Sequence, residues 1–275
     1  MSICPRRVCV IAAAGLAFFL AGPRPAHALV LDWNSVSWSN ASMVNFASVS
    51  NSFDLNGDSV NDLTIGMTAQ NNTFRTDPTT GAQTPAINET LTGGQPTGQQ
   101  SLMIAGNLFT HSDLTVHLSF NNSPGQFAAT NVSFTIFDID ITTNSDIISG
   151  IYGVTSDGTQ IAPTITNVGG AVDFTGTGLN QLLTGNNPSA DTGPGSSNGN
   201  ATISFSSTVT DIFFTFSNTA GAPRYQDIAI GDISFTPVPE INPAATSAIS
   251  CVLALGLTVL VQRRAKLKAR RLRAA

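Results

Sequence analysis

Apolar and polar residues alternate in several short segments of this chain, and this alternation limits what the chain can fold into. The pattern runs through residues 114–120, 131–137, 201–207 and 211–217. In residues 227–235 it shifts by one position at Gly231, which predicts a β-bulge. Because successive side chains of a strand point to opposite faces, such segments are typical of strands with one buried face. We therefore expect β-sheets in the middle of the chain.

Helix-forming residues are scarce in the same region. Residues 29–236 contain no Lys and one Glu, Glu89, whereas Thr, Ser, Asn and Gly are abundant. This composition favours strands and turns over helices. Many short strands separated by turns predict one all-β domain over residues 29–236, an antiparallel β-sandwich of jelly-roll-like form. Residues 69–100 and 184–200 are polar and rich in turn formers, and we expect long loops there.

The N-terminus has the features of a signal peptide. Arg6 and Arg7 precede an apolar run, and the small residues around His27 form a cleavage pattern. The run is too short for an ordinary membrane span. Residues 1–28 are therefore predicted to be a signal peptide for the Sec pathway, cleaved before Leu29. The alternative is an uncleaved N-terminal anchor.

Charge is distributed unevenly along the chain. Residues 29–239 hold two basic residues, Arg75 and Arg224, and sixteen acidic ones, a net charge of 2 − 16 = −14. Nucleic acid is excluded as a partner, since its binding requires cationic groups that neutralise phosphates. An acidic surface suits cations and neutral glycans. The same residues contain no Cys, so neither a disulfide framework nor a thiolate site is expected in them.

The C-terminus combines an apolar segment with a basic tail. Residues 244–261 carry no charge, and as a helix they would be about 27 Å long, enough to cross a bilayer core. Seven basic residues follow within residues 262–275: Arg263, Arg264, Lys266, Lys268, Arg270, Arg271 and Arg273. Positive charge beside a span stays in the cytoplasm. The pattern predicts a transmembrane helix over 244–261, with the sandwich outside and the tail inside.

A short motif, Val238-Pro239-Glu240, lies in the proline-rich residues 237–243 just before the apolar segment. The motif, the apolar helix and the Arg-rich end, in that order, resemble a PEP-CTERM sorting signal of exported proteins in Gram-negative bacteria. Residues 237–275 would form this signal, although Ile241 stands where the family has a second proline. The resemblance implies an exosortase as processing partner, an inner-membrane intermediate, and a final place at the cell surface or outside the cell. The simpler alternative is a permanent C-terminal anchor.

Residues 54–63 read DLNGDSVNDL and place oxygen-bearing side chains at alternate positions. Such spacing allows a loop to fold around a hard cation, with a backbone carbonyl as a further ligand. The segment resembles the calcium loop of FG-GAP-type β-hairpins, with Ser59 in place of one glycine. The resemblance implies a structural Ca²⁺ held by Asp54, Asn56, Asp58, Asp62 and the carbonyl of Val60. The alternative is an acidic turn without metal.

Asp138, Asp140 and Asp146 form a second acidic group. Asp138 and Asp140 share one face of a strand because they are two residues apart. The group could hold a second cation or contact a glycan, but carboxylates at strand ends usually lie in water, and we expect that here.

Trp33 and Trp38 are candidates for contact with a glycan, because sugar rings stack on aromatic side chains. Five residues apart on an extended chain, they would point to opposite faces, so one could be buried and one exposed. Burial of both in the core is an equally good interpretation.

The sequence lacks the HExxH motif of metalloproteases and, in residues 29–239, any Cys that could act as a nucleophile. His111 and His117 are interpreted as exposed histidines of a sheet. We therefore expect a non-enzymatic protein of the cell surface or extracellular matrix, associated with exopolysaccharide and biofilm. The alternatives are a glycan-binding module and a secreted glycan-active enzyme on a jelly-roll scaffold.

Overall fold

Strands dominate the part of the chain that the computed structural model describes. Within residues 26–239, which form one compact unit, the described helices are two short 3-10 turns, η1 (Gly178–Asn180) and η2 (Ser197–Gly199). The all-β prediction is therefore confirmed. The described residues are 27–70, 74–108, 113–122, 125–141, 144–186, 195–219 and 224–239, together with Gln262 and Arg264.

The strands form two antiparallel sheets. Sheet A runs in the order β1 (Leu29–Leu31), β17 (Ile233–Pro239), β8 (Gly125–Phe137), β16 (Arg224–Ile230), β5 (Ser101–Leu108), β4 (Ala86–Asn88). Three further strands of this sheet attach beside that path: β14 (Ala201–Phe205) and β7 (Asn121–Asn122) on β8, and β11 (Thr164–Thr166) on β14.

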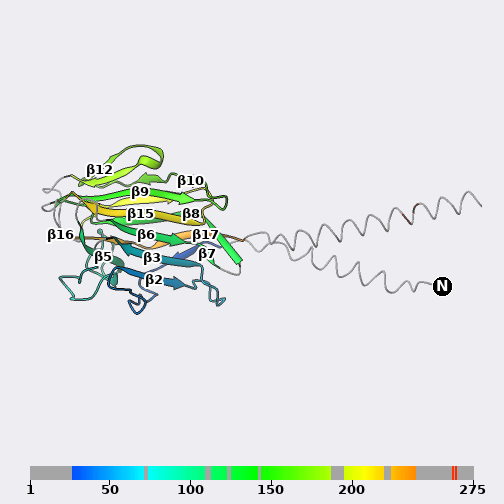
Figure 1. Cartoon of the computed structure of the whole chain (residues 1–275), viewed down its shortest axis with the longest axis horizontal. Helices are drawn as coiled ribbons and strands as arrows, with labels where there is room; N and C mark the ends of the chain where they lie inside the picture. Colours follow the sequence, from blue (N-terminus) through cyan, green and yellow to red (C-terminus); the bar gives the residue numbers. More distant parts are fainter. Residues whose placement is uncertain are drawn as a thin grey trace, which may run out of the picture. The chain divides into compact units, whose positions relative to one another are not determined.

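Sheet B has the order β12 (Val172–Thr175), β13 (Leu182–Gly185), β9 (Asp146–Val154), β15 (Asp211–Asn218), β6 (Leu114–Ser119), β3 (Leu63–Ala69), β2 (Ser48–Phe53). A short strand, β10 (Gln160–Ile161), pairs with β9. Figure 1 shows most of this order, from β12 through β9, β15, β6 and β3 to β2.

Most successive long strands pass from one sheet to the other. β5, β8, β14 and β16 belong to sheet A, whereas β6, β9 and β15 between them belong to sheet B. Strands that pair are therefore often far apart in the sequence, as β6 with β15 and β5 with β16. This winding is typical of a jelly roll and agrees with the predicted arrangement.

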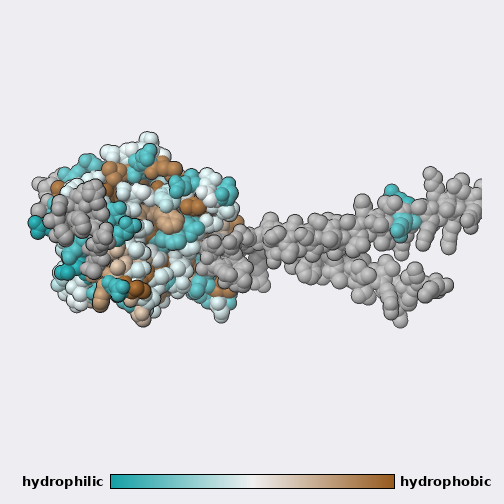
Figure 2. Space-filling view, in the orientation of Figure 1, coloured by the Kyte–Doolittle hydropathy of each residue, from teal (hydrophilic) through white to brown (hydrophobic). Residues whose placement is uncertain are grey.

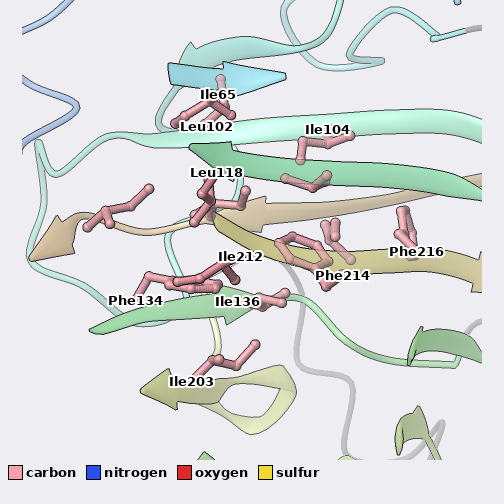
Figure 3. Packing of buried hydrophobic residues seen from close by; sticks show 14 of the residues in the cluster. Ile65, Leu102, Ile104, Leu118, Phe134, Ile136, Ile203, Ile212, Phe214 and Phe216 are labelled. Carbon is pink, nitrogen blue, oxygen red and sulfur yellow. The ribbon is translucent and has the colours of Figure 1, made fainter. Parts of the chain in front are cut away.

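The core lies between the sheets, where the alternating apolar residues meet. In β6 and β15 every second residue is buried, as the sequence pattern predicts. Figure 3 shows the buried side chains of the two sheets directed toward one another, with Phe134 of β8 near Phe214 of β15. Their rings are stacked with centroids 6.1 Å apart. Burial of this apolar layer is the main stabilising contribution to the fold.

The predicted irregularity at Gly231 separates β16 from β17. Both strands run along β8, and the pairing register shifts by one residue between Ile230–Ile136 and Ser234–Ser133. A Cβ atom at Gly231 would lie 2.7 Å from the ring of Phe137, so a larger residue would displace that ring. The glycine therefore allows the strand to pass closely over β8 where the register changes.

Strand β17 continues beyond the predicted end of the domain at residue 236. Pro237, Val238 and Pro239 pair with Ala129, Ala128 and Phe127 of β8. On its other side β17 pairs with β1 only at residues 233–235, so the prolines, which lack an N–H, lie where that edge has no partner. Two residues of the predicted sorting motif thus belong to the last strand of the sandwich.

Several predicted segments lie outside the described residues. They are residues 1–26 of the signal peptide, Glu240 of the motif, residues 244–261, and the basic cluster apart from Arg264. No helix that is long and apolar enough to span a membrane occurs among the residues that are described.

Replacing Phe214 by Ala should lower the free energy of unfolding by about 3–5 kcal/mol, because the removed ring leaves a cavity between the sheets. Phe174 of β12 is 40% exposed and provides the matched control. Its replacement by Ala should cost less than about 1 kcal/mol. Urea denaturation of both variants measures the difference, and equal losses would contradict the described core.

Candidate functional site

Three rings form a row across the outer face of sheet B. His117 of β6, Phe213 of β15 and Tyr152 of β9 are direct neighbours in the strand register. The imidazole of His117 stacks on Phe213 with ring centroids 4.2 Å apart, and Tyr152 stacks on the other side of Phe213 at 5.2 Å. Because rings stacked across strands stand upright on the sheet, their edges face the solvent. The row is a small apolar ridge.

Small hydroxyl residues surround this ridge. On one side, Ser52, Thr64, Ser119 and Asp211 occupy one register row across β2, β3, β6 and β15. On the other side, the corresponding row consists of Ser48, Thr68, Thr115, Thr215 and Ser149. Figure 2 shows a described surface of mixed character, where apolar residues are scattered among neutral and hydrophilic ones.

The central row continues from His117 onto Gly66 of β3 and Ser50 of β2. Gly66 has no side chain, and a Cβ built there would have one neighbour within 4 Å, the hydroxyl of Ser50 at 4.0 Å. The face of the imidazole that is turned away from Phe213 therefore borders open space above Gly66. Ser50 bounds this space on the far side. We call this space above Gly66, between the imidazole of His117 and the hydroxyl of Ser50, the slot.

An acidic partner fixes the imidazole that forms the wall of this slot. His117 Nε2 and Asp211 Oδ1 are 2.7 Å apart, and the side chain of His117 is 38% exposed. Burial alone would raise the pKa of Asp211, but hydrogen bonds from His117, Thr210 and Ser119 outweigh this effect and lower the pKa. Asp211 is therefore a carboxylate at neutral pH and holds the ring in one orientation.

The predicted calcium loop closes on itself through its own acidic side chains. Asp54 accepts hydrogen bonds from the backbone N–H groups of Gly57 at 2.7 Å and Ser59 at 2.8 Å. Asp62 accepts one from the N–H of Leu55 at 2.7 Å and one from the amide of Asn56 at 3.1 Å. These hydrogen bonds fold the loop that connects β2 to β3.

The electrostatics of this loop fit a cation. Burial raises the pKa of Asp62, and the charges of Asp58 and Asp54 raise it further. These three carboxylates repel one another, and a cation among them would relieve the repulsion. In the geometry of the described residues, however, no three acidic, His or Cys side chains are placed together as metal ligands. Calcium binding at this loop stays a prediction.

The two tryptophans differ in their surroundings. Trp33 is fully buried in the core, and its Nε1 donates a hydrogen bond to the carbonyl of Gly231 at 2.9 Å. It therefore offers no ring face to a sugar, which corrects the prediction for this residue. Trp38 is half-buried, packs edge-on against Trp33 and donates a hydrogen bond to Asn40. The three rings on sheet B are the better candidates. His117 was expected on an exposed sheet face, as found, but its neighbours Phe213 and Tyr152 were not predicted.

A pocket of about 120 Å³ lies beside the turn between β16 and β17. Its lining includes Gln95, Gln99, Gln100, Thr135, Phe137 and Asp232. Asp232 accepts hydrogen bonds from the backbone N–H of Trp33 at 3.1 Å and from Gln99 Nε2 at 3.2 Å. Amides and a carboxylate of this kind hydrogen-bond polar ligands. Residues 95–100 were expected to be loop alone, so this pocket was not predicted.

Comparison with known proteins gives little guidance. No known family and no curated protein matches the sequence. Two similar solved structures are family 11 carbohydrate-binding modules from Clostridium thermocellum. One, in complex with a β-1,3-1,4-mixed-linked tetrasaccharide, is 10% identical with a TM-score of 0.25, and the match covers 78% of this chain and 97% of that chain. The other, from a cellulosomal cellulase, is 9% identical with a TM-score of 0.24, covering 80% and 99%.

Replacing Ser59 by Gly should stabilise the protein by roughly 0.5–1 kcal/mol, because Ser59 has a left-handed backbone with φ of 71°. Ser59→Ala is the control, since alanine keeps the Cβ atom that strains this conformation. Thermal unfolding of both variants without divalent cations measures the effect. If the Ser59→Gly protein is no more stable than Ser59→Ala, residue 59 does not adopt the left-handed backbone conformation.

Proposed function

We propose that this chain is an exported, non-enzymatic protein whose β-sandwich binds neutral polysaccharide on the outer face of sheet B. The observation that carries the proposal is the row of His117, Phe213 and Tyr152 beside the open slot above Gly66. A pyranose ring has apolar C–H faces and hydroxyl edges. An aromatic ridge bordered by hydroxyl side chains provides a counterpart for both.

The chemistry of the slot favours a neutral sugar. A sugar ring above Gly66 could place one face on the imidazole of His117 and direct hydroxyls to Ser50 and Asp211. A carboxylate that accepts hydrogen bonds is stronger than a neutral acceptor, so Asp211 would contribute to orientation. The net charge of −14 over residues 29–239 disfavours an acidic polysaccharide. Ser119, the hydroxyl residue beside the pair His117–Asp211, hydrogen-bonds the carboxylate of Asp211.

Filling the slot should abolish most of the binding. We expect Gly66→Val to weaken retention of the full-length chain by mixed-linkage β-glucan, xylan or galactomannan at least about tenfold, a loss of about 1.4 kcal/mol. Valine suits a strand, and its Cβ would meet no backbone atom within 4 Å at this position, so the fold should persist. Affinity electrophoresis in gels with each soluble polysaccharide measures the retention.

Thr164→Val is the matched control, because Thr164 is exposed on β11 of the other sheet. It should bind as well as the unaltered chain. Loss of retention in Gln100→Leu but not in Gly66→Val would move the site to the pocket around Asp232. A chain that none of the three polysaccharides retards would contradict the proposal for neutral glycans.

The proposal includes the route by which the chain reaches its place of action. The signal peptide over residues 1–28 would export it, and residues 237–275 would hold it in the inner membrane until an exosortase processes it. The cleavage must occur close to the folded domain, because Val238 and Pro239 pair with β8. A structural Ca²⁺ in residues 54–62 belongs to the same proposal, as a brace for the β2–β3 hairpin.

Intact mass of the protein recovered from the outer surface of its host tests the sorting signal. We expect a C-terminus close to Glu240, directly after the last residue of β17. A host strain without exosortase should yield a chain that still ends at Ala275. An unprocessed C-terminus in both strains would show that residues 244–261 serve as a permanent anchor.

A further inference from the structure

The pocket at the turn between β16 and β17 has the size of one small ring. Its volume is about 120 Å³. An engineered cavity of about 150 Å³ holds benzene, so this pocket has room for the edge of one six-membered ring. Gln95 in its lining is exposed, and the pocket therefore opens to solvent on that side. A bound molecule would enter by one edge and leave its remainder in water.

One side of the pocket belongs to sheet A. Thr135 and Phe137 of β8 contribute to the lining. Both point away from the layer between the sheets, because Ile136 between them points into it. A Cβ at Gly93 would lie 2.3 Å from the ring of Phe137, so only glycine lets the loop before β5 pass this closely over the ring. The loop and the outer face of sheet A thus enclose the pocket.

The other side of the pocket is a loop that hydrogen bonds hold in place. Asn34 Nδ2 donates to the carbonyl of Gly98 at 2.6 Å, and Asn34 Oδ1 accepts from the N–H of Gln100 at 2.8 Å. Gln99 Nε2 donates to both oxygens of Asp232, at 3.3 and 3.2 Å. These contacts tie the loop to the turn after β16, so the shape of the pocket is fixed before any ligand binds.

The polar groups of the lining match neighbouring hydroxyl groups. Asp232 accepts N–H groups on both of its oxygens, as an ionised carboxylate does. The side-chain amides of Gln95 and Gln100 make no hydrogen bond to other described residues, so each offers a donor and an acceptor to a ligand. A carboxylate repels anions, and an ammonium group donates only. A hydroxyl both donates and accepts, so it suits the carboxylate and the amides together.

We propose that this pocket binds the edge of one neutral sugar residue through two adjacent hydroxyl groups. One hydroxyl donates to Asp232, and the Gln100 amide donates to the other. Phe137 and Gly231 supply the apolar part of the lining, which suits the C–H groups of the ring. The pocket lies on sheet A and takes a single residue, so this proposal is independent of polysaccharide binding on sheet B. A free monosaccharide and the terminal residue of a glycan present the same edge.

Calorimetric titration of the full-length chain in a polyoxyethylene detergent, which has no sugar headgroup, tests the pocket. The probes are the methyl glycosides of glucose, galactose, mannose and xylose, and we expect at least one to bind. Gln100→Leu should weaken its binding about fivefold, the effect of one lost hydrogen bond. Asp232→Asn should weaken it at least about tenfold, because a charged acceptor forms a stronger hydrogen bond.

Gln160→Leu is the matched control, because Gln160 is exposed on β10 of the other sheet, and it should leave the binding unchanged. Should Asp232→Asn fail to fold, Gln100→Leu still decides, since the Gln100 side chain makes no hydrogen bond to other described residues. Failure of all four glycosides to bind, or binding that neither variant weakens, would overturn the proposal.

Two further titrations assign the ligand and separate the sites. An oligosaccharide that ends in the preferred sugar and binds as tightly as its glycoside would assign the pocket to glycan ends. Binding of the glycoside alone would assign it to free sugars, and either result supports the proposal. Gly66→Val should leave glycoside binding in the pocket unchanged. Retention by polysaccharides is read separately, so failure of either proposal leaves the other standing.

Discussion

Contact between the inner faces of sheets A and B is the interaction on which the rest of the structure depends. Each sheet alone would expose one apolar face to water, and neither would be stable. Phe134 and Phe214, on opposite sheets, stack within this layer and fix the distance between the sheets. Side chains alternate along a strand, so only one face of β6 and β15 is buried in the core. The residues on the other face contact solvent and are not constrained by core packing.

That freedom is what makes the outer face of sheet B a candidate site. Ser and Thr cover most of it, and they fit strands because their small side chains suit a pleated surface. Phe213 is the exception, since an apolar ring on a solvent face gains little for folding. Its position between His117 and Tyr152 shields both of its faces, while its edge stays accessible. An exposed apolar ridge lowers the solubility of a protein unless a ligand or a partner covers it. We therefore connect this ridge with a ligand.

The positions of the strands were easier to predict from the sequence than which strands pair with one another. Alternation identified β6, β14 and β15, and the shift at Gly231 marked the irregularity between β16 and β17, because both signals are local. The row of His117, Phe213 and Tyr152 could not be foreseen, since a jelly roll pairs strands that are almost a hundred residues apart. The burial of Trp33 could not be foreseen either. Its Nε1 donates a hydrogen bond to the carbonyl of Gly231, which is 198 residues away in the sequence.

The scarcity of basic residues shapes how this fold accommodates its acids. Asp77 is fully buried, yet it accepts hydrogen bonds from Thr79, Thr80, Thr90 and Asn88, so neutral donors take the place of an Arg or Lys. These donors outweigh burial and lower the pKa of Asp77. Asp211 likewise accepts hydrogen bonds from a histidine and two hydroxyl groups, and these lower its pKa.

Asp146 departs from this rule, because one of its oxygens receives no donor at all. Burial raises the pKa of Asp146 well above its usual range, which favours the neutral carboxyl that a buried site tolerates better than a charge. The expectation that Asp140 and Asp146 lie in water is therefore wrong, since both are buried. Local sequence could not reveal this, because the burial depends on how the end of β8 and the start of β9 pack within the folded domain.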